Sequence, residues 1–512
     1  MGVKDLWSLV SPTGEVLPLT ALEGKAVAID LSCWVVDCQA LHLGHVARPH
    51  LRNLFFRTMA LLNNGVLPVF VLEGDAPSMK WNTINSRNQR NFHSSANPTG
   101  KNSSVKTGKR SRFKSVLKEC RELLDMLGVP WVQASGEAEA TCAALNYHNM
   151  VEGVISQDSD VFLYGGQTVF RNFTANQSKA TVEKFSMHLL EEHLKLTRGG
   201  LILLALLLGC DYFPAGVQGV GKDTAVRLLR VWYQKGVKDP NAVLGSVLWQ
   251  LTQHSNLNAR KWKNGNDEEL EAGVRDRMLA TDGFPFSDII QEFRRRLDPP
   301  SLKVKWGQPQ FSDLVRWCII KLEWEGNYAV EKISPVVTRW MVTCGWYGGR
   351  ISYPDLGLMP LSIVKRCVRR GVSACQVKWK VLSRNLPENS PVELTTDEPL
   401  HLLQASLPAL LEEFEEAKAA KKVKGSYGEK LIVRLKMTLH PVVYKDLNHQ
   451  IMFIPQVHPP GKLLQGKLKD LLIVQCLLWN PCRQILFIGC MILMVESGGL
   501  FTCLGEVVTR LP

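Results

Sequence analysis

The chain has 512 residues, enough for two or three domains that each bury a core. Its 61 Lys and Arg residues exceed its 48 Asp and Glu residues, and the formal net charge of +13 favours an anionic partner, although a merely basic soluble protein is an equally good reading of charge alone. The thirteen cysteines form no C-x-x-C pair, which argues against a disulfide framework and for a reducing compartment.

Neither end of the chain predicts a membrane segment. The N-terminus, MGVKDLWSLV, lacks the apolar core of a signal peptide. Near the C-terminus two apolar runs, 471–479 and 485–495, are each shorter than the roughly 20 residues that a membrane-spanning helix needs. We therefore expect no membrane partner.

The first 210 residues alternate between strand and helix patterns. Residues 25–31 and 67–72 are short, β-branched and apolar, as in buried strands, and residues 50–64 between them have helical spacing. This β-α-β order predicts a parallel sheet and an α/β fold. Further along we expect a helix at 113–127, a strand at 128–134, a second helix from about 137, a strand at 151–156 and a long apolar helix at 187–208.

Two stretches interrupt this pattern. Between positions 87 and 118 there are nine Lys or Arg residues and no acid, and residues 93–112 have no apolar period, so we expect them to be disordered in the free protein. Residues 252–281 are polar and charged, which predicts a surface insertion.

The character of the chain changes beyond position 355. Residues 362–371 and 375–382 are expected to form a hairpin, and a helix is expected at about 399–422, with an acidic centre and a basic end. Together these predict a small β-β-α module. The tail from 426 to 512 is expected to be disordered or atypical.

Seven carboxylates lie at or near the ends of apolar stretches in the first 211 residues. Strands that end in acids deliver them to the carboxyl edge of a sheet, where mutual repulsion calls for a hard divalent cation such as Mg²⁺ or Mn²⁺. E-x-E or D-x-D alone is common in helices and turns, but the whole order is far more specific. An acidic metal pocket in a basic protein suits cleavage of a nucleic-acid backbone. The seven are Asp30, Glu73, Glu137, Glu139, Asp158, Asp160 and Asp211.

The segment GVQGVGKDTA, at 216–225, predicts a phosphate-binding turn. Gly216, Gly219 and Gly221 allow the backbone amides to face a phosphate at the start of a helix, and Lys222 adds a positive charge. Asp223 stands where a Walker A loop needs Ser or Thr. The pattern matches a helix-hairpin-helix clamp that grips DNA backbone without reading sequence; the alternative is an ordinary glycine-rich connection.

These motifs resemble the flap endonuclease and XPG-type nuclease superfamily over about residues 1–340. The matching segments are MGVKDLW, AIDLS, GEAEA, QDSD, GCDY and GVQGVGK. Within the superfamily the chain most resembles the GEN branch of eukaryotic Holliday junction resolvases. The segments PHLRNLFFR, SVLKEC and PWVQASGEAEA, the polar basic stretch at 94–112, and a module near 360–422 that is similar to a chromodomain carry this narrower resemblance.

The resemblance implies a domain plan. It comprises a PIN-like nuclease with a central, mostly parallel sheet flanked by helices, then a helix-two-turn-helix region and the chromodomain-like module. We expect XPG N-terminal and internal nuclease regions at 1–95 and 113–205, separated by a basic arch segment at 96–112. The clamp and helical region is expected at 206–350, the module at 358–425 and the tail at 426–512.

The resemblance also implies residue roles. The seven acids would hold two Mg²⁺ ions, or Mn²⁺ in their place, with Glu139 near both ions; a K⁺ ion would bind at the clamp. Asp30 and Glu73 would serve catalysis directly, with Lys80 and Arg87 facing the scissile phosphate. Val36 stands where flap endonucleases place a stacking Tyr, so Trp34 would either take that task or belong to the core. The expected DNA contacts are Gly2, Trp34, Lys109, Arg110, Arg112, Gly219, Gly221 and Lys222.

The implied function is a structure-selective DNA endonuclease that resolves four-way junctions and cuts 5′ flaps and replication forks. The free protein would be a monomer, and two copies would pair on a junction. It would be nuclear, or else cytoplasmic with access to DNA at mitosis. The alternatives are a replication-type flap nuclease, although no Q-x-x-[LI]-x-x-F-F sliding-clamp motif is present, and a non-catalytic chromatin binder. In the module, Trp379 fits one wall of a methyl-lysine cage, but Leu361 and Leu382 occupy other walls. We therefore expect the module to make DNA or packing contacts.

Overall fold

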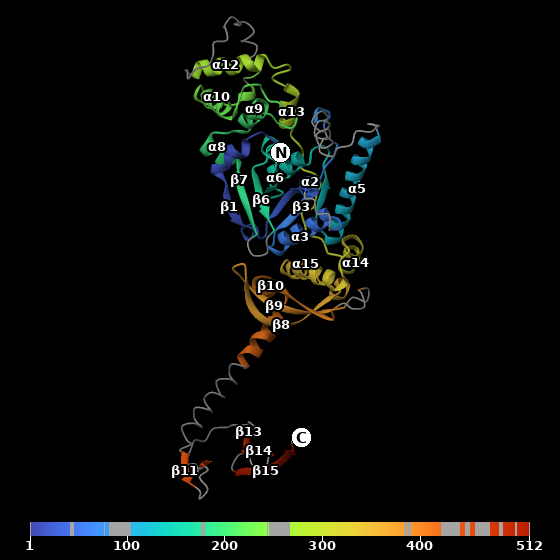
Figure 1. The fold of residues 1–512 in the computed structure, drawn as a ribbon, viewed down its shortest axis with the longest axis vertical. Coiled ribbons are helices and arrows are strands. Elements are labelled where there is room, and N and C mark those ends of the chain that lie inside the picture. Colours follow the sequence, from blue (N-terminus) through green and yellow to red (C-terminus); the bar gives the residue numbers. More distant parts are fainter. Residues whose placement is uncertain are drawn as a thin grey trace. The chain divides into compact units, whose positions relative to one another are not determined.

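The computed structural model describes residues 2–40, 46–75, 77–80, 104–175, 180–242, 244, 267–382, 386, 391–420 and, from 441 onward, the backbone of five strands. Two units are distinguished, Met1–Ala417 and Lys418–Pro512. The first unit holds every element that positions the candidate site (Figure 1).

A seven-stranded sheet in the order β1-β7-β6-β5-β2-β3-β4 is the centre of the first unit. Strands β2 to β6 pair in parallel, whereas β7 and β1 are antiparallel, so the predicted parallel sheet is confirmed with an antiparallel edge. The strands are β1 (Glu15–Pro18), β2 (Ala26–Asp30), β3 (Leu67–Leu72), β4 (Trp131–Gln133), β5 (Gly153–Ile155), β6 (Thr168–Thr174) and β7 (Thr181–Ser186).

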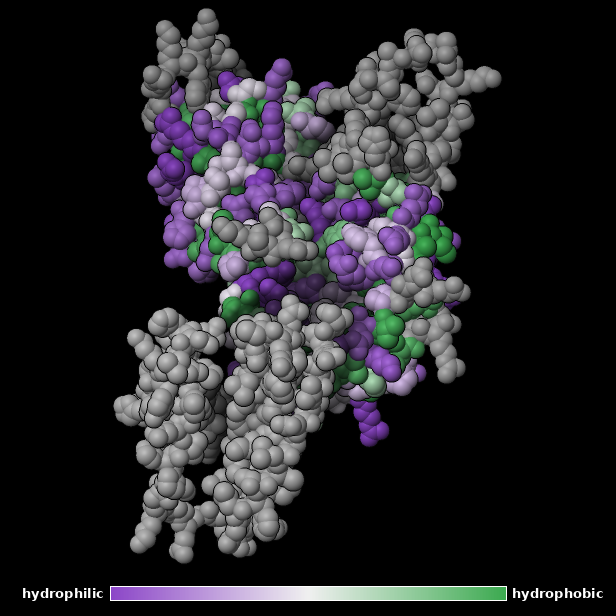
Figure 2. Space-filling view, turned by 60° about the horizontal axis from the view of Figure 1, so that its bottom comes forward, coloured by the Kyte–Doolittle hydropathy of each residue, from purple (hydrophilic) through white to green (hydrophobic). Residues whose placement is uncertain are grey.

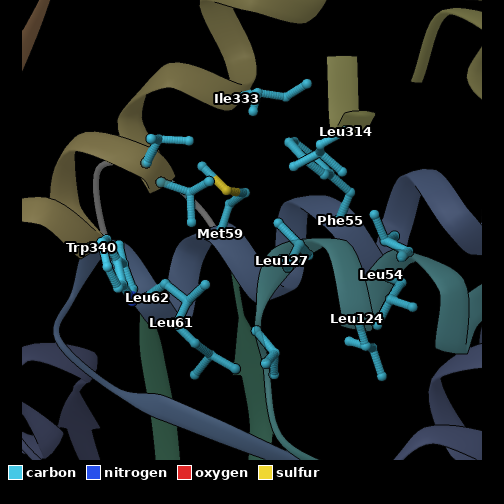
Figure 3. Packing of buried hydrophobic residues seen from close by; sticks show 14 of the residues in the cluster. Leu54, Phe55, Met59, Leu61, Leu62, Leu124, Leu127, Leu314, Ile333 and Trp340 are labelled. Atoms are coloured by element: carbon cyan, nitrogen blue, oxygen red, sulfur yellow. The ribbon is translucent and has the colours of Figure 1, made fainter. Parts of the chain in front are cut away.

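Helices cover both faces of this sheet, and β2 shows why. Its side chains alternate between two apolar cores: Val27 and Ile29 face one, and Ala28 faces the other. A strand buried on both faces must be apolar throughout, as this one is until Asp30. Figure 3 shows the first core, where α3, α5, α14 and α15 interdigitate. Their bounds are α3 (Pro49–Asn63), α5 (Ser104–Leu127), α14 (Phe311–Leu322) and α15 (Gly326–Trp346).

The second core brings the nuclease sheet together with the predicted clamp. The shorter helices beside the sheet are α1 (Leu6–Val10), α2 (Leu31–Ala40), α6 (Ala138–Tyr147), α7 (Asp160–Leu163) and α8 (Met187–Leu194). The clamp helices are α9 (Arg198–Leu208), α10 (Lys222–Gln234), α12 (Asp267–Leu279) and α13 (Ser287–Arg294).

Two expectations for the helices need correction, the first at 187–208 and the second in the basic segment before residue 113. The single helix expected at 187–208 is two helices, because Lys195 adopts a left-handed conformation and Thr197 caps α9 by accepting a bond from the Gly200 amide. Within the expected surface insertion, residues 267–279 form α12, which buries Leu270, Val274 and Met278 beside α10.

The predicted disorder at 93–112 is wrong for its last nine residues. Helix α5 begins at Ser104, so the basic segment 104–112 continues the amphipathic helix expected at 113–127. Once a packed helix exists, adding residues such as Lys and Arg costs little, because propagation fixes only one residue for each new hydrogen bond. Residues 93–103 lie outside the described part of the chain.

The module after residue 357 has one strand more than expected. Strands β8 (Leu358–Arg369) and β9 (Val372–Val381) form the predicted hairpin, and β10 (Glu393–Pro399) pairs with β9. Its sequence, ELTTDEP, is too polar to predict a strand, but Thr396 and Glu398 point inward to the indole of Trp379 and the guanidinium of Arg339. The short α16 (Tyr353–Leu356) precedes the sheet, α17 (Leu400–Ser406) follows it, and a further helix covers 408–420. The likeness to a chromodomain stays a prediction.

Five strands lie in the tail, and its expected disordered or atypical character stays a prediction. They are β11 (Pro441–Lys445), β12 (Ile451–Pro455), β13 (Leu472–Asn480), β14 (Ile485–Glu496) and β15 (Gly499–Arg510). The apolar runs near 471–495 are rich in Ile, Leu and Val, which fit a strand as well as a helix. Among the described residues, no helix is both long and apolar enough to cross a membrane.

On the face of the molecule shown in Figure 2, hydrophilic residues dominate the coloured surface and hydrophobic ones lie between them in small patches. Among described residues the exposed large apolar side chains include Val16, Ile320, Tyr347 and Val368. Singly exposed apolar side chains of this kind are normal for a protein surface.

Candidate active site

All seven predicted acids lie at the ends of elements that meet at one edge of the sheet. Asp30 ends β2, and Glu73 directly follows β3. The remaining five stand at helix starts or in the loops beside them: Glu137 caps α6, Glu139 is in its first turn, Asp158 and Asp160 lead into α7, and Asp211 follows α9. Six are buried and Glu73 is partly exposed.

The acids form two groups that share one member. Ligand atoms of Asp30, Cys33 and Glu139 lie within 4.8 Å of one another, and so do those of Glu139, Asp158 and Asp160. We call these the Asp30 group and the Asp160 group. Glu139 therefore lies where it could bridge two cations, the position that the family resemblance implies for it.

Burial makes the ionised forms of the clustered carboxyl groups unfavourable. Burial raises the pKa of Glu73 to about 8, with Asp30 and Glu137 adding to the shift, and raises the pKa of Asp158 to about 6. The pKa values of Glu139 and Asp160 are also raised, first by burial and then by neighbouring carboxylates. Carboxyl groups in such surroundings either hold protons or bind cations.

Lys80 supplies part of the positive charge that the buried carboxylates need. Its Nζ pairs with Glu137 Oε2 and lies 3.4 Å from Asp211 Oδ2. Burial alone would lower the pKa of this ammonium, but Glu139, Glu137 and Asp211 together raise it. Lys80 ends a 3₁₀ turn, Ser78–Lys80, after β3. Arg87, its predicted partner, lies outside the described residues.

The oxygen atoms of the cluster fit divalent metal ions. Within the described part of the chain, Glu137 Oε1 and Asp160 Oδ1 are buried and accept no hydrogen bond. An unpaired buried carboxylate oxygen is costly, and a bound cation removes the cost. Because the Asp160 group offers oxygen ligands alone, it suits Mg²⁺ or Mn²⁺.

The N-terminal segment holds the loops that carry three of the acids. The Val3 amide donates to Ser159 Oγ at 2.9 Å, and the Trp7 indole donates to the Gln157 carbonyl at 2.9 Å. The Lys4 amide donates to the Gly209 carbonyl, two residues before Asp211. This explains why MGVKDLW belongs with the acidic motifs, although nothing in its own chemistry pointed to that role.

Gly2 is in contact with the acids themselves. Its φ is +82°, and a Cβ there would lie 2.2 Å from Asp158 Oδ1 and 2.8 Å from Asp160 Oδ1. Only glycine fits this position without moving the loop. Its predicted contact with DNA stays a prediction.

Trp34 is a core residue, which corrects its assignment as a DNA contact. Its side chain is 5% exposed and stacks on Phe173, with ring centroids 5.8 Å apart, while the Arg57 guanidinium lies 4.8 Å from its ring. A ring buried against Phe173, Phe70 and Arg57 has no free face for a base. Val36, at 46% exposed, is one of the outward residues of α2.

Cys33 is a buried residue of α2 that also belongs to the site. Its Sγ donates to Asp30 Oδ2 at 2.9 Å, while the Ser32 amide donates to Oδ1 at 2.8 Å. Burial, together with Asp30 and Glu139, raises the pKa of the thiol, so that it remains a donor. Cys33 follows Asp30 by three residues, about one helical turn. This spacing is the feature of the sequence that could have indicated their contact.

The predicted clamp has the expected backbone. Gly219 has a φ of +80°, Gly221 caps α10, and Lys222 is its first residue. Lys222 Nζ lies 3.3 Å from Ser8 Oγ, beside a hollow of about 390 Å³ that Arg227 and Arg230 also line. The other predicted basic contacts, Lys109, Arg110 and Arg112, are on α5, and their side chains lie outside the described residues.

Known proteins are similar to this chain in sequence and in fold. The family models for the XPG N-terminal domain and the XPG I-region match residues 1–94 and 128–211. The chain is 35% identical to flap endonuclease GEN homolog 1 of Mus musculus over 457 residues, which is 80% of this chain and 49% of the mouse protein. The Homo sapiens homologue is 35% identical over 473 residues, 82% of this chain and 51% of its own length.

A crystal structure of human GEN1 in complex with Holliday junction DNA matches with a TM-score of 0.67 and 36% identity, covering 83% of this chain and 100% of that one. The chain spans about half the length of the two mammalian relatives. The matching motifs, acid cluster and fold together place it: the chain belongs to the XPG family of nucleases, in the GEN branch.

Proposed function

We propose that the chain is a structure-selective DNA endonuclease that cuts four-way junctions by paired nicks and also cleaves 5′ flaps. The observation that carries this proposal is the intact cluster of seven acids in a chain that matches human GEN1 bound to Holliday junction DNA. A non-catalytic chromatin binder would have no need of buried, mutually repelling carboxylates, which lower the stability of a fold unless a cation is bound.

The residues divide the chemistry between them. The Asp30 group and the Asp160 group would each hold a Mg²⁺ or Mn²⁺ ion, with Glu139 shared between the ions. Ions held there would activate the attacking water and neutralise the leaving 3′ oxygen, and the expected products would carry 5′-phosphate and 3′-hydroxyl ends. Lys80, already held at the cluster by Glu137, would stabilise charge that develops on the scissile phosphate.

Substrate choice would come from surfaces outside the cluster. The turn before α10 would grip the phosphate backbone of a duplex arm through Lys222 and the amides near Gly219 and Gly221, and a K⁺ ion there is part of this proposal. The helical basic segment 104–112 would contact a second arm. The β8–β10 module would add DNA or packing contacts rather than methyl-lysine recognition.

Two copies would act on one junction, because resolution needs two coordinated cuts, while the free protein would be monomeric. The site of action would be nuclear DNA, reached either in the nucleus or at mitosis. The net charge of +13 would favour association with branched DNA of any sequence.

The experiment that tests the function compares cleavage of an intact four-way junction, a 5′ flap and a plain duplex in Mg²⁺. We expect the junction and the flap to be cut and the duplex to be spared. Blocking the flap's 5′ end with a bulky protein should barely slow cutting, since an intact junction offers no free end to thread. If the blocked flap resists and junctions stay intact, the chain is a replication-type flap nuclease instead.

A further inference from the structure

Two buried tyrosines meet between the nuclease sheet and the clamp helices. Tyr164 directly follows α7, and Tyr212 lies in the turn after α9. Their hydroxyl oxygens are 2.6 Å apart, and the side chains are 8% and 9% exposed. A buried hydroxyl is costly unless it is hydrogen-bonded, and here each tyrosine supplies the partner of the other. Neither residue has a part in the proposed metal chemistry.

The hydroxyl pair joins two segments that carry acids of the cluster. The Tyr164 amide donates to the Asp160 carbonyl at 3.0 Å, so these two residues are fixed one helical turn apart. Asp211 and Tyr212 are the two central residues of one tight turn, so they move together. The bond between the hydroxyls therefore fixes the position of Asp211 relative to Asp160.

Such a connection is needed because the acids repel one another. Burial first, and then the charges of Asp158 and Asp211, raise the pKa of Asp160. Like charges in a buried site push their segments apart unless other contacts hold them. The bond between Tyr164 and Tyr212 opposes this separation without adding a charge of its own.

The clamp holds the hydroxyl pair from the other side. Phe293 of α13 is 0% exposed, and its ring packs edge-on against both tyrosines, with centroids 5.2 Å from Tyr164 and 5.3 Å from Tyr212. Arg198, the first residue of α9, donates to the Leu163 carbonyl at 2.8 Å and also to the Phe293 carbonyl. A shift of α13 would therefore disturb the pair. We call Tyr164, Tyr212 and Phe293 the tyrosine joint.

We propose that Tyr164 and Tyr212 are positioning residues for the nuclease reaction, and that Phe293 makes this positioning depend on the clamp. The hydroxyl pair holds Asp211 at the distance from Asp160 at which both acids serve the cation-binding cluster. The tyrosines contact neither the DNA nor a cation and act only through these acids. The effect on cleavage rests on the proposed function, whereas the effect on cation binding does not.

Tyr164→Phe and Tyr212→Phe test the proposal, because each removes one hydroxyl and keeps the ring. We expect one of the Mn²⁺ ions bound without DNA to bind about ten- to a hundredfold more weakly, measured by electron paramagnetic resonance of the free ion. Cleavage of a four-way junction should need correspondingly more Mg²⁺, with the rate at saturating Mg²⁺ and the junction affinity in Ca²⁺ within a fewfold of wild type. Phe293→Leu should shift Mn²⁺ binding in the same direction.

The double variant of both tyrosines should lose no more than either single variant, because all three lack the same bond. Tyr233→Phe is the matched control: its hydroxyl pairs with Thr197 Oγ1 at 2.9 Å, at the end of α10 far from Lys222, so Mn²⁺ binding should not change.

Unchanged Mn²⁺ affinity in whichever of Tyr164→Phe, Tyr212→Phe and Phe293→Leu folds would overturn the proposal. A double variant that shows the sum of the two single losses, or an equal shift in Tyr233→Phe, would overturn it as well. Weakened Mn²⁺ binding by the joint variants of a chain that cuts no DNA would uphold the tyrosine joint and refute the proposed function.

Discussion

The Asp30 group and the Asp160 group are built in different ways. Asp30 is fixed at the end of a central strand, and both of its oxygens accept hydrogen bonds from the first turn of α2. Asp158 lies in the loop before α7 and Asp160 begins that helix, and the N-terminal segment holds this loop through Ser159. One Asp160 oxygen has no hydrogen-bond partner within the described residues. The Asp30 group is thus ordered by the helix that follows Asp30. The Asp160 group depends on the N-terminal segment, about 150 positions away in the chain.

We therefore expect mutations that affect the Asp30 group and the Asp160 group to impair cleavage in different ways. A change to the Asp30 group removes a ligand from a rigid frame and leaves the rest of the cluster in place. A change to the N-terminal segment moves the Asp160 group without touching any ligand. Both kinds of change should spare DNA affinity, since phosphate contacts elsewhere supply it.

The largest effect is expected for Asp30→Asn. Removing this charge should lower the cleavage rate by roughly a thousandfold or more, because ion-assisted charge stabilisation is worth several kcal/mol. Junction affinity, measured by gel shift in Ca²⁺, should stay within a fewfold of wild type. Cleavage close to the wild-type rate in Mg²⁺ would rule out Asp30 as a metal ligand.

Gly2→Ala tests the dependence of the Asp160 group on the N-terminal segment. The new Cβ would press on Asp158 and Asp160, so we expect cleavage to fall by about ten- to a hundredfold with a weaker apparent affinity for Mg²⁺. Gly24→Ala is the matched control: Gly24 also has a positive φ, +76°, but no atom lies within 4 Å of the added Cβ. It should cost only about 1 kcal/mol of stability. Equal cleavage by the two variants would contradict the account.

Lys222→Glu changes a residue outside the Asp30 group and the Asp160 group, so it should leave both groups intact. It removes one phosphate contact, so binding to every duplex-containing substrate should weaken by a similar factor, and the slope of log affinity against log salt should fall by about one. Titration of junction, flap and duplex at several salt concentrations checks this. A loss restricted to one sequence would argue against a backbone clamp.

The smallest effect concerns pH and stability. The pKa of Glu73 is raised from 4.5 to about 8 and that of Asp158 from 3.8 to about 6, so the folded metal-free protein holds protons that the unfolded chain releases. Its stability should therefore fall as the pH rises from about 4 to 8. Mg²⁺ should raise the melting temperature by a few degrees at about pH 8 and by less at about pH 5, where protons compete. A Mg²⁺ shift that does not depend on pH would contradict the burial of these acids.

Much of this site could be predicted from the sequence, because each acid ends an apolar stretch whose type is readable. Asp30 after AVAI and Glu73 after LPVFVL are strand ends by pattern alone. What could not be predicted depends on contacts between distant residues. Trp34 is covered by Phe173 and Arg57, and β10 exists because Thr396 and Glu398 are paired with Trp379 and Arg339. Local pattern carries no information about such partners.

The two-group arrangement itself is tested most directly by counting bound Mn²⁺ ions per chain at equilibrium, for example by electron paramagnetic resonance of the free ion. The account predicts two ions for the wild-type chain and one each for Asp30→Asn and Asp160→Asn. It also predicts weakened binding of both ions in Glu139→Gln, because Glu139 belongs to both groups. A wild-type chain that binds a single ion, or a Glu139→Gln variant that still binds two with unchanged affinity, would contradict it.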